Sequence, residues 1–333
     1  MPSAEPSDTA VTTPGASAAE VVVSLPRASW AEALGELPGV RAVVWDCAGP
    51  VPDPAPQVVV PPYMGAPPLR ESLDRLPGLR TVQLLTNGFD GVVEQLPDHV
   101  TLCNAAGVHD ASTAELAVGL AIAALRGVDD AARSMASGAW SAARRTSLAD
   151  RRALVLGWGG VGRAVADRLE PFEVQVTAVA SAPRVEEGPA GRVRVHGPVE
   201  LPDLLPEHDL VVVACPLTDA TRGLVDAAFL AALPDGALLV NVGRGPVVDT
   251  DALLAEVRTG RLRAALDVTD PEPLPPGHPL WTTPGVLVTP HVGGNTTAFR
   301  PRALALLREQ LQRTVSGAPL LNVVRAGRDA PRG

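Results

Sequence analysis

The chain has 333 residues, of which 46% are hydrophobic and 20% charged, and its formal net charge is −9. This composition is typical of a folded globular protein, and the length favours two domains over one. The acidic charge excludes the basic surface that a general binder of nucleic acid or of an anionic membrane needs. No residue is lysine, which excludes lysine as a nucleophile or Schiff base, so cationic chemistry must use Arg or His.

The two ends of the chain and its cysteines indicate a cytoplasmic protein. Residues 1–19 are rich in Ser, Ala, Thr and Pro and have no basic start, so we expect a disordered lead-in rather than a targeting signal. A disordered tail is expected over 327–333, and no apolar run approaches the ~20 residues of a membrane span. Cys47, Cys103 and Cys215 are odd in number and far apart, which fits neither a disulfide framework nor a Cys-based metal site. We therefore expect no bound metal.

Strands and helices alternate over the first hundred residues. Strands are predicted at 21–25, 40–45, 57–60, 79–85 and 100–103. A helix from Trp30 to Leu37 has Ser29 as its predicted N-cap, and a proline-rich loop at 46–56 stands where a second crossover helix would be expected. This alternation predicts a parallel sheet covered by helices.

A glycine-rich turn organises the middle of the chain. An apolar run leads into Gly157, and Gly159 and Gly162 follow before a segment with helical spacing. Gly157 permits a sharp turn, Gly159 lets the backbone approach a pyrophosphate, and Gly162 lets the helix pack close to its strand. A second strand at 174–179 completes the context that a lone glycine motif lacks. The predicted phosphate-binding residues at this helix N-terminus are Gly157, Gly159, Gly160, Val161 and Gly162.

Four later apolar segments each carry a polar or special residue at their C-terminal end. They lie within 209–216, 237–245, 263–268 and 286–291. Because parallel strands collect their carboxyl ends at one edge of a sheet, we expect the candidate site residues to gather there. Long helices are predicted from Asp110 to about Arg126 and from Arg302 to about Val315.

Three residues stand out in this part of the chain. Arg244 lies in Asn-Val-Gly-Arg-Gly, Glu272 in Asp-Pro-Glu-Pro and His291 in Thr-Pro-His-Val-Gly-Gly. With these motifs in this order, the chain from about 21 to 324 closely resembles the D-isomer-specific 2-hydroxyacid dehydrogenases. The resemblance implies that Arg244 binds the carboxylate and carbonyl of the substrate. It also implies that His291 is the catalytic acid and base and that Glu272 is its hydrogen-bond partner.

The chemistry of 2-keto acid reduction suits these residue types. Hydride delivery to the carbonyl carbon develops charge on the oxygen, so a proton donor must lie within hydrogen-bond reach. An unperturbed His has a pKa of about 6.5, and the carboxylate of Glu272 favours the charged, donating form of His291. The planar fork of Arg244 can hold a carboxylate by two parallel bonds.

The resemblance also implies an α/β fold of two doubly wound parallel-sheet domains. A Rossmann NAD(P)-binding domain over 111–294 is inserted into a flavodoxin-like substrate (catalytic) domain, 20–110 and 295–326, and the family expectation is a homodimer built on the nucleotide domain. Asn87 and Gly88 match the loop that binds the substrate carboxylate. Phosphite-oxidising relatives have a lysine where Asn87 stands, which argues against that activity. Further predicted cofactor contacts are Cys215, Pro216, Val242, Gly243, Asp267, Gly293 and Gly294.

The loop after the second nucleotide-domain strand predicts the cofactor. The position expected to carry an acidic residue for the ribose hydroxyls is Ala180, so repulsion of a 2′-phosphate is absent. Ser181 and Arg184 offer a hydroxyl and a guanidinium to that phosphate. Glu186 and Glu187 lie close by and oppose this interpretation. We expect NADP(H) to be preferred, with NAD(H) as the alternative.

Three functions remain open from the sequence. The leading hypothesis is an oxidoreductase of small 2-keto acids such as glyoxylate or hydroxypyruvate. A cofactor-sensing, corepressor-like binding protein is one alternative, although the intact Arg, Glu and His argue against it. The other is a dedicated biosynthetic dehydrogenase of a larger or phosphonate-bearing acid, which the unusual loop at 46–56 would favour.

Overall fold

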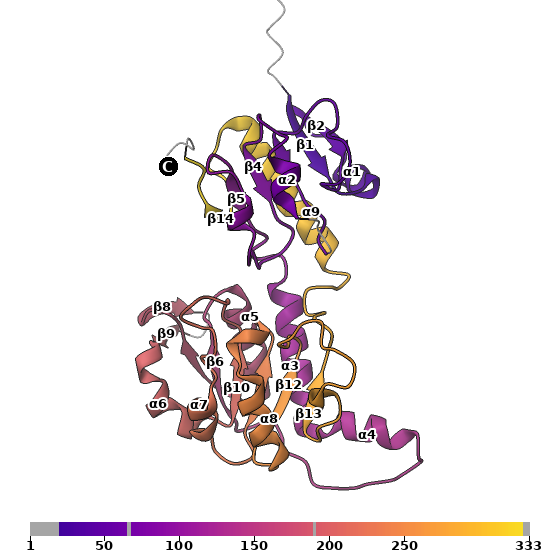
Figure 1. Ribbon diagram of the computed structural model, residues 1–333. Coiled ribbons are helices and arrows are strands. Elements are labelled where there is room, and N and C mark those ends of the chain that lie inside the picture. Colours follow the sequence, from indigo (N-terminus) through magenta and orange to yellow (C-terminus); the bar gives the residue numbers. More distant parts are fainter. Residues whose placement is uncertain (1–19, 65–67, 189–190, 329–333) are drawn as a thin grey trace, which may run out of the picture.

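Two lobes, each built on its own sheet, make up the computed structural model (Figure 1). It describes residues 20–64, 68–188 and 191–328. The lobes are connected by the long helix α3 (Asp110–Arg126) and by the segment that leads into α9 (Phe299–Ser316). The predicted lead-in at 1–19 lies outside the described residues, as does most of the predicted tail.

The upper lobe is formed by residues from both ends of the chain. Its elements are β1 (Val21–Leu25), α1 (Ala28–Leu34), β2 (Val40–Val44), β3 (Val58–Val59), α2 (Leu69–Leu73), β4 (Thr81–Gln83), β5 (Thr101–Cys103), α9 and β14 (Val323–Arg325). The strand order is β2-β1-β3-β4-β5-β14, and only β14 is antiparallel to its neighbour. The apolar side chains of α1 and α9 pack on one face and those of α2 on the other. This is the predicted flavodoxin-like arrangement.

The lower lobe has a sheet of eight strands. They are β6 (Arg152–Leu156), β7 (Gln175–Val179), β8 (Arg184–Gly188), β9 (Gly191–His196), β10 (Leu210–Val213), β11 (Leu238–Asn241), β12 (Arg263–Leu266) and β13 (Val286–Val288). The order is β8-β9-β7-β6-β10-β11-β12-β13, and all neighbours are parallel except β8 and β9. The order reverses between β6 and β10, so the predicted Rossmann fold is confirmed and its ligand-binding crevice is expected at that point.

Helices cover both faces of the lower sheet. They are α3, α5 (Gly160–Leu169), α6 (Leu201–Leu204), α7 (Ala227–Ala231) and α8 (Thr250–Arg258), whereas α4 (Val128–Met135) projects away from the sheet. The apolar side chains of α3 and α5 pack on one face, and those of α6, α7 and α8 on the other. Consequently β10 and β11 are buried along their whole length, which explains the apolar sequence of β10 and of β11 up to Asn241.

Gly157 makes the sharp turn from β6 into α5. Its φ is +109°, and a Cβ there would lie 2.5 Å from the backbone nitrogen of Cys215. Both the torsion and the close approach to the end of β10 require glycine at this position. The turn therefore brings the start of α5 directly to the switch point.

Several elements differ from the prediction. The helix α9 begins at Phe299 rather than Arg302, because Pro301 lies in its first turn, where proline is tolerated. The helix α1 begins at Ala28, so Ser29 is inside it and not its N-cap. The hairpin of β8 and β9 was not predicted, since its charged, alternating sequence resembles a loop.

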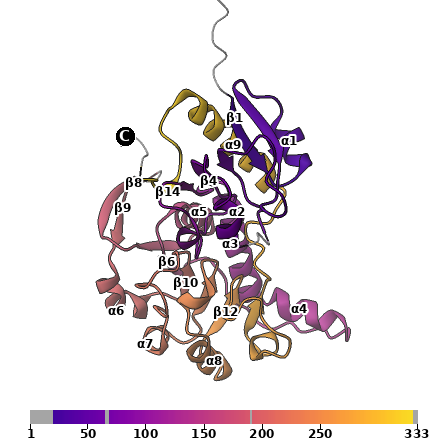
Figure 2. The same cartoon turned by 45° about the horizontal axis from the view of Figure 1, so that its top comes forward.

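A projecting arm, defined as α4 and residues 136–150, extends from the lower lobe (Figure 1, Figure 2). Val128, Met135 and Trp140 on this arm have 54%, 81% and 96% of their surfaces exposed. No single helix in the described parts of the chain is long and apolar enough to cross a membrane, and α3 with α4 reach that length only as a pair bent by 68°.

Candidate active site

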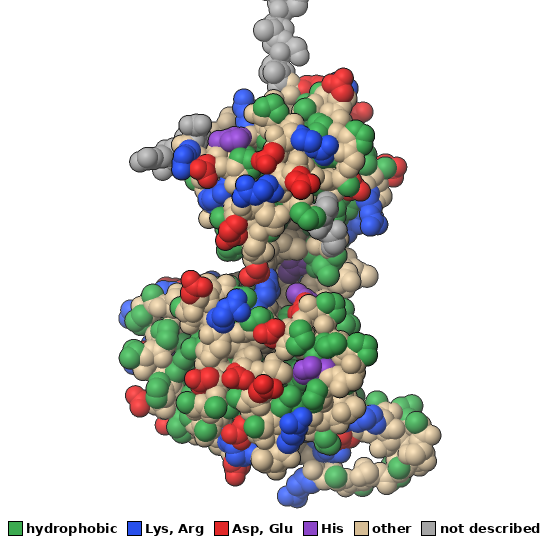
Figure 3. Space-filling model, in the orientation of Figure 1, with side chains coloured by type: hydrophobic (Ala, Val, Ile, Leu, Met, Phe, Trp, Pro, Cys, Tyr) green, Lys and Arg blue, Asp and Glu red, His purple; other side chains and the backbone are tan. Residues whose placement is uncertain are grey.

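Three neighbouring strands of the lower sheet bring the predicted catalytic residues together. Arg244 follows β11, Glu272 lies in the loop after β12, and His291 follows β13. Since these strands are adjacent and parallel, their carboxyl ends meet at one edge of the sheet. Histidine, acidic and basic side chains lie side by side at the waist between the lobes (Figure 3).

His291 and Glu272 form a hydrogen-bonded pair. The distance from His291 Nδ1 to Glu272 Oε1 is 2.5 Å. The hydrogen bond to Glu272 raises the pKa of His291 above its ordinary value, and the charge of Glu272 raises it further. Partial burial and the charge of the nearby Arg244 act in the opposite direction but are together smaller. Burial acts to raise the pKa of Glu272, but the hydrogen bond and charge of His291 outweigh it, so this pKa is lowered. The pair therefore favours an imidazolium beside a carboxylate.

The carboxylate of Asp267 fixes the loop that carries His291. Asp267 is 3% exposed, and its two oxygens accept hydrogen bonds from Thr289 Oγ1 at 2.6 Å and from the backbone N–H groups of Val292 and Gly293, both at 2.9 Å. His291 has a φ of +52°, in the left-handed region, and its N–H donates to the carbonyl of Asp267 at 2.8 Å. The predicted contact of Asp267 with a cofactor stays a prediction, since both its oxygens already accept bonds from this loop.

Arg244 reaches from the lower lobe to the upper one. Its Nε donates to Asp90 Oδ2 at 3.0 Å, and its Nη1 donates to the carbonyl of Gly243 at 2.7 Å. A Cβ on Gly88 would lie 1.6 Å from Nη2 of Arg244, so the guanidinium lies against the backbone of the Asn87-Gly88 turn. The structure therefore brings this predicted substrate loop to the predicted carboxylate-binding arginine.

Asn87 links its turn to the start of α3. Its Nδ2 donates to Asp110 Oδ1 at 3.3 Å, while Asn104 Nδ2 donates to the carbonyl of Asn87 at 2.8 Å. The carboxylate of Asp110 in turn lies against Gly160, where a Cβ would be 2.0 Å from Oδ2. The predicted substrate loop and the glycine-rich turn thus both lie against the carboxylate of Asp110.

The glycine-rich turn fits the pyrophosphate of a dinucleotide. A Cβ at Gly159 would meet nothing within 4 Å, so the backbone there is open to a ligand. Gly160 and Val161 begin α5, whose first N–H groups have no partner within the helix and favour an anion. Gly162 packs against the carbonyl of Gly157.

The other predicted cofactor residues lie around the same crevice. Cys215 and Pro216 follow β10, and Val242 and Gly243 follow β11. Burial raises the pKa of the Cys215 thiol to about 11, so it is a neutral packing group rather than a nucleophile. The backbone of Gly294 approaches His109 closely, because a Cβ there would lie 2.6 Å from Nδ1.

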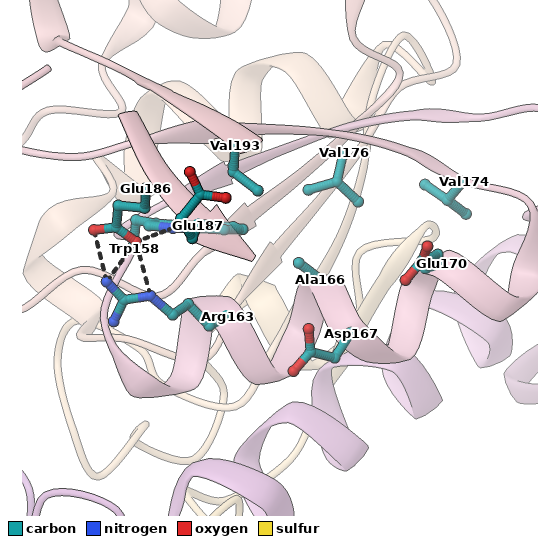
Figure 4. Close-up of a pocket in the computed structure, with 10 residues that line it drawn as sticks. All are labelled: Trp158, Arg163, Ala166, Asp167, Glu170, Val174, Val176, Glu186, Glu187 and Val193. Carbon is teal, nitrogen blue, oxygen red and sulfur yellow. Dashed lines mark hydrogen bonds and ion pairs between the residues drawn. The ribbon is translucent and has the colours of Figure 1, made fainter. Parts of the chain in front are cut away.

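The loop predicted to determine cofactor preference contains an ion-pair cluster, in which one of the two opposing glutamates, Glu186, turns inward. Glu186 accepts a bond from Arg163 Nη2 at 2.8 Å and one from Trp158 Nε1 at 3.2 Å (Figure 4). It also accepts a bond from Arg184 Nε at 2.5 Å. The hydrogen bonds of Arg163 and Arg184 lower the pKa of Glu186, so this carboxylate is charged. Ser181 is exposed. Glu186 thus turns toward the predicted phosphate-binding arginine.

A hollow of about 440 Å³ lies next to this cluster, beside α5. It is lined by Trp158, Arg163, Ala166, Asp167, Glu170, Val174, Val176, Glu186, Glu187 and Val193 (Figure 4). None of these residues belongs to the pair of His291 and Glu272, so the hollow is separate from the candidate catalytic site.

Three residues at the waist were not singled out from the sequence: Tyr63, Asp90 and His109. The ring of His109 lies 2.8 Å from the carbonyl of Leu85 and stacks on Tyr63, with 5.4 Å between ring centroids. The sequence offered one signal for His109, its position just before the predicted start of α3. Asp90 closes an Asn-Gly turn, but its partner is 154 positions away and has no local signature.

Within residues 20–64, 68–188 and 191–328, no group of three His, Cys, Asp or Glu side chains is arranged to hold a metal ion.

Comparisons with known proteins define the class. The model of the family described as D-isomer specific 2-hydroxyacid dehydrogenase, NAD binding domain, matches residues 118–293. Glyoxylate reductase/hydroxypyruvate reductase of Homo sapiens is 35% identical over 216 residues, which cover 63% of this chain and 65% of the human protein. That match spans just under two thirds of the human relative.

Solved structures agree over nearly the whole chain. A D-isomer specific 2-hydroxyacid dehydrogenase from Xanthobacter autotrophicus Py2, in complex with NADPH and MES, is 32% identical with a TM-score of 0.77, covering 92% of this chain and 98% of that one. An NADPH-dependent glyoxylate/hydroxypyruvate reductase from Sinorhizobium meliloti, in complex with NADP and sulfate, is 26% identical with a TM-score of 0.76 and the same coverage. The fold and these matches define an NAD(P)-dependent oxidoreductase. The chain belongs to the D-isomer-specific 2-hydroxyacid dehydrogenases.

Replacing Glu272 by Gln should lower the pKa of His291, because the hydrogen bond and charge of Glu272 raise it. The raised pKa means that His291 stabilises the fold below pH 6.5 and loses this effect as pH rises through the raised value. Because the pKa of Glu272 is lowered, this residue stabilises the fold above pH 4.5, and the stabilisation is lost as the pH falls through the lowered pKa. Glu272→Gln should therefore reduce the free energy of unfolding most between pH 4.5 and 6.5.

NMR titration of the His291 ring measures its pKa. Urea unfolding between pH 4.5 and 6.5, and again above pH 6.5, measures the change in stability. Glu309→Gln, which removes an exposed carboxylate paired with Arg313, is the matched control. An unchanged titration of His291 in Glu272→Gln would contradict the pairing.

Proposed function

We propose that the protein reduces small 2-keto acids of the glyoxylate or hydroxypyruvate type to the corresponding 2-hydroxy acids. The observation that carries this is the convergence of Arg244, Glu272 and His291 at the ends of three adjacent parallel strands, with His291 Nδ1 2.5 Å from Glu272 Oε1. Relatives named glyoxylate reductase/hydroxypyruvate reductase support this substrate class. The established family membership makes the corepressor-like alternative the weaker one.

The residues divide the reaction between them. A bound reduced nicotinamide supplies the hydride. Arg244 holds the substrate carboxylate and sets the face of the carbonyl, with the backbone of Asn87 and Gly88 as a further carboxylate contact. His291 holds its proton at Nε2, since Nδ1 faces Glu272, and passes it to the carbonyl oxygen as charge develops there. In the reverse direction, the neutral ring accepts the hydroxyl proton at the same nitrogen.

We infer that NADP(H) is the preferred cofactor. Ala180 leaves the ribose end of the crevice without an acidic side chain, and Arg184 Nη2 lies 3.5 Å from the carbonyl of Trp158 in the glycine-rich turn. A 2′-phosphate bound beside Ser181 would compete with Glu186 for Arg184. The cluster therefore supplies the cation for the phosphate and also weakens the bond between them. The solved relatives in complex with NADPH or NADP support this choice.

We further infer a cytoplasmic homodimer that uses the nucleotide domain. The projecting arm carries Met135 and Trp140, and large apolar side chains with so much exposed surface support an interface on this arm. Residues 20–110 and 295–326 would act as the substrate domain and 111–294 as the nucleotide domain. A monomer in analytical ultracentrifugation would contradict the dimer.

His291→Ala should lower kcat/KM for keto-acid reduction by roughly 10²–10⁴-fold, the usual range for general acid–base catalysis, without weakening cofactor binding. Arg244→Lys should raise KM for the keto acid, because an ammonium cannot reproduce the planar fork. Steady-state kinetics on a panel of keto acids with both reduced cofactors test this, and the exposed His99→Ala is the matched control. Turnover of none of them by the wild type would favour the corepressor-like role. Turnover only of larger or phosphonate-bearing acids would favour the biosynthetic one.

Arg184→Ala should lower kcat/KM for NADPH by about tenfold and leave that for NADH nearly unchanged, because a charge-assisted bond to the 2′-phosphate is lost. Glu186→Gln should shift the preference further toward NADPH, since it releases Arg163 and Arg184 from their shared carboxylate. Glu187→Gln is the control, because its side chain is 82% exposed and lies 3.7 Å from Arg192. A wild type that uses NADH at least as well as NADPH, with an unchanged ratio in Arg184→Ala, would show that this loop is assigned wrongly.

A further inference from the structure

Asp90 is held in a well-defined turn that faces the candidate site. Thr86 Oγ1 donates to the carbonyl of Gly88 at 2.7 Å, and Asn104 anchors the carbonyl of Asn87. The Asp90 side chain is 44% exposed, and its Oδ2 accepts the bond from Arg244 Nε at 3.0 Å. A carboxylate of the upper lobe is therefore presented to the arginine of the lower lobe in a fixed direction.

Among the described residues, the hydrogen bonds of Arg244 leave the donors along one edge of its guanidinium without an acceptor. A guanidinium has five N–H donors. Asp90 takes the Nε side, and the carbonyl of Gly243 takes one donor of Nη1 on the side of the arginine's own backbone. The edge formed by Nη1 and Nη2 keeps two donors that point in parallel, the geometry that a carboxylate accepts.

We propose that Asp90 is a positioning residue that orients Arg244 for the substrate carboxylate and couples this orientation to the approach of the two lobes. The long side chain of Arg244 can adopt many rotamers. An arginine that is already held in its binding rotamer loses less conformational entropy when the substrate binds. Asp90 and Arg244 lie on different lobes, so their bond forms only when the lobes are close. The inference rests on the proposed function, because it assumes that Arg244 binds substrate.

The charges at the site agree with this arrangement. The charge of Arg244 acts against the raised pKa of His291, so the two cationic groups oppose each other across the site. The carboxylate of Asp90 is bonded to Arg244 and so offsets part of its charge.

The test compares Asp90→Ala and Asp90→Asn with the wild type. We expect Asp90→Ala to raise KM for the keto acid about tenfold, with little change in kcat or in KM for NADPH. Asp90→Asn should have a smaller effect, since the amide oxygen still accepts a bond from Nε. Asp74→Asn, an exposed carboxylate at the end of α2, controls for net charge. If Asp90→Ala unfolds, the comparison is made with Asp90→Asn.

A double-mutant cycle separates positioning from a general structural role. In an Arg244→Gln background, Asp90→Ala should change KM less than about twofold, because the group through which it acts is gone. Equal losses in both backgrounds, an unchanged KM, or a fall in KM that shows Asp90 competing with substrate would each overturn the proposal. If the wild type reduces no keto acid, the proposed function falls and this inference with it. If the wild type turns over and Asp90→Ala matches it, only the inference fails.

Discussion

The buried carboxylate of Asp267 is the interaction on which the candidate site depends. A charged group with 3% exposure is costly unless every oxygen is paired, and here the pairing comes from Thr289, Val292 and Gly293. These bonds bend the chain after β13, so that His291 takes a left-handed conformation and its ring reaches Glu272. The proposed acid/base pair of His291 and Glu272 is therefore positioned by a third residue that does not belong to it.

Polar contacts between the lobes have a different physical role. Exposed ion pairs contribute little to stability, typically about 0–1 kcal/mol, so the pair of Arg244 and Asp90 is better understood as fixing direction than as holding the lobes together. Stacked rings act within the upper lobe, where Tyr63 lies on both His109 and Phe299. Because His109 precedes α3 and Phe299 begins α9, this stacking ties together the upper-lobe ends of the two connections, while the polar pairs set the orientation of the groups that face the site.

The sequence was sufficient for the fold class and for the three residues at the strand ends. Uninterrupted apolar runs reveal buried parallel strands, and the glycine-rich turn marks the first strand of the Rossmann unit. Pro301 concealed the true start of α9, because proline in a first helical turn is read as a break. The hairpin of β8 and β9 was missed since an edge strand rich in Arg and Glu carries almost no apolar signal. Asp90 could not be assigned, because side-chain pairing across folded segments leaves no trace in local spacing, whereas Glu186 lies close enough in sequence to Arg184 to be named as an opposing charge.

The groups proposed to bind anions in this chain share one electrostatic feature. Each has a carboxylate beside it: Asp90 at Arg244, Asp110 at the start of α5, and Glu186 at Arg163 and Arg184. With a net charge of −9 the protein as a whole repels anions, although beyond about 8 Å this field is screened at physiological ionic strength. Long-range steering of a keto acid or a phosphorylated cofactor is therefore weak. Recognition must arise at short range, from donors whose directions the neighbouring carboxylates have already fixed, which favours geometric selectivity over fast electrostatic capture.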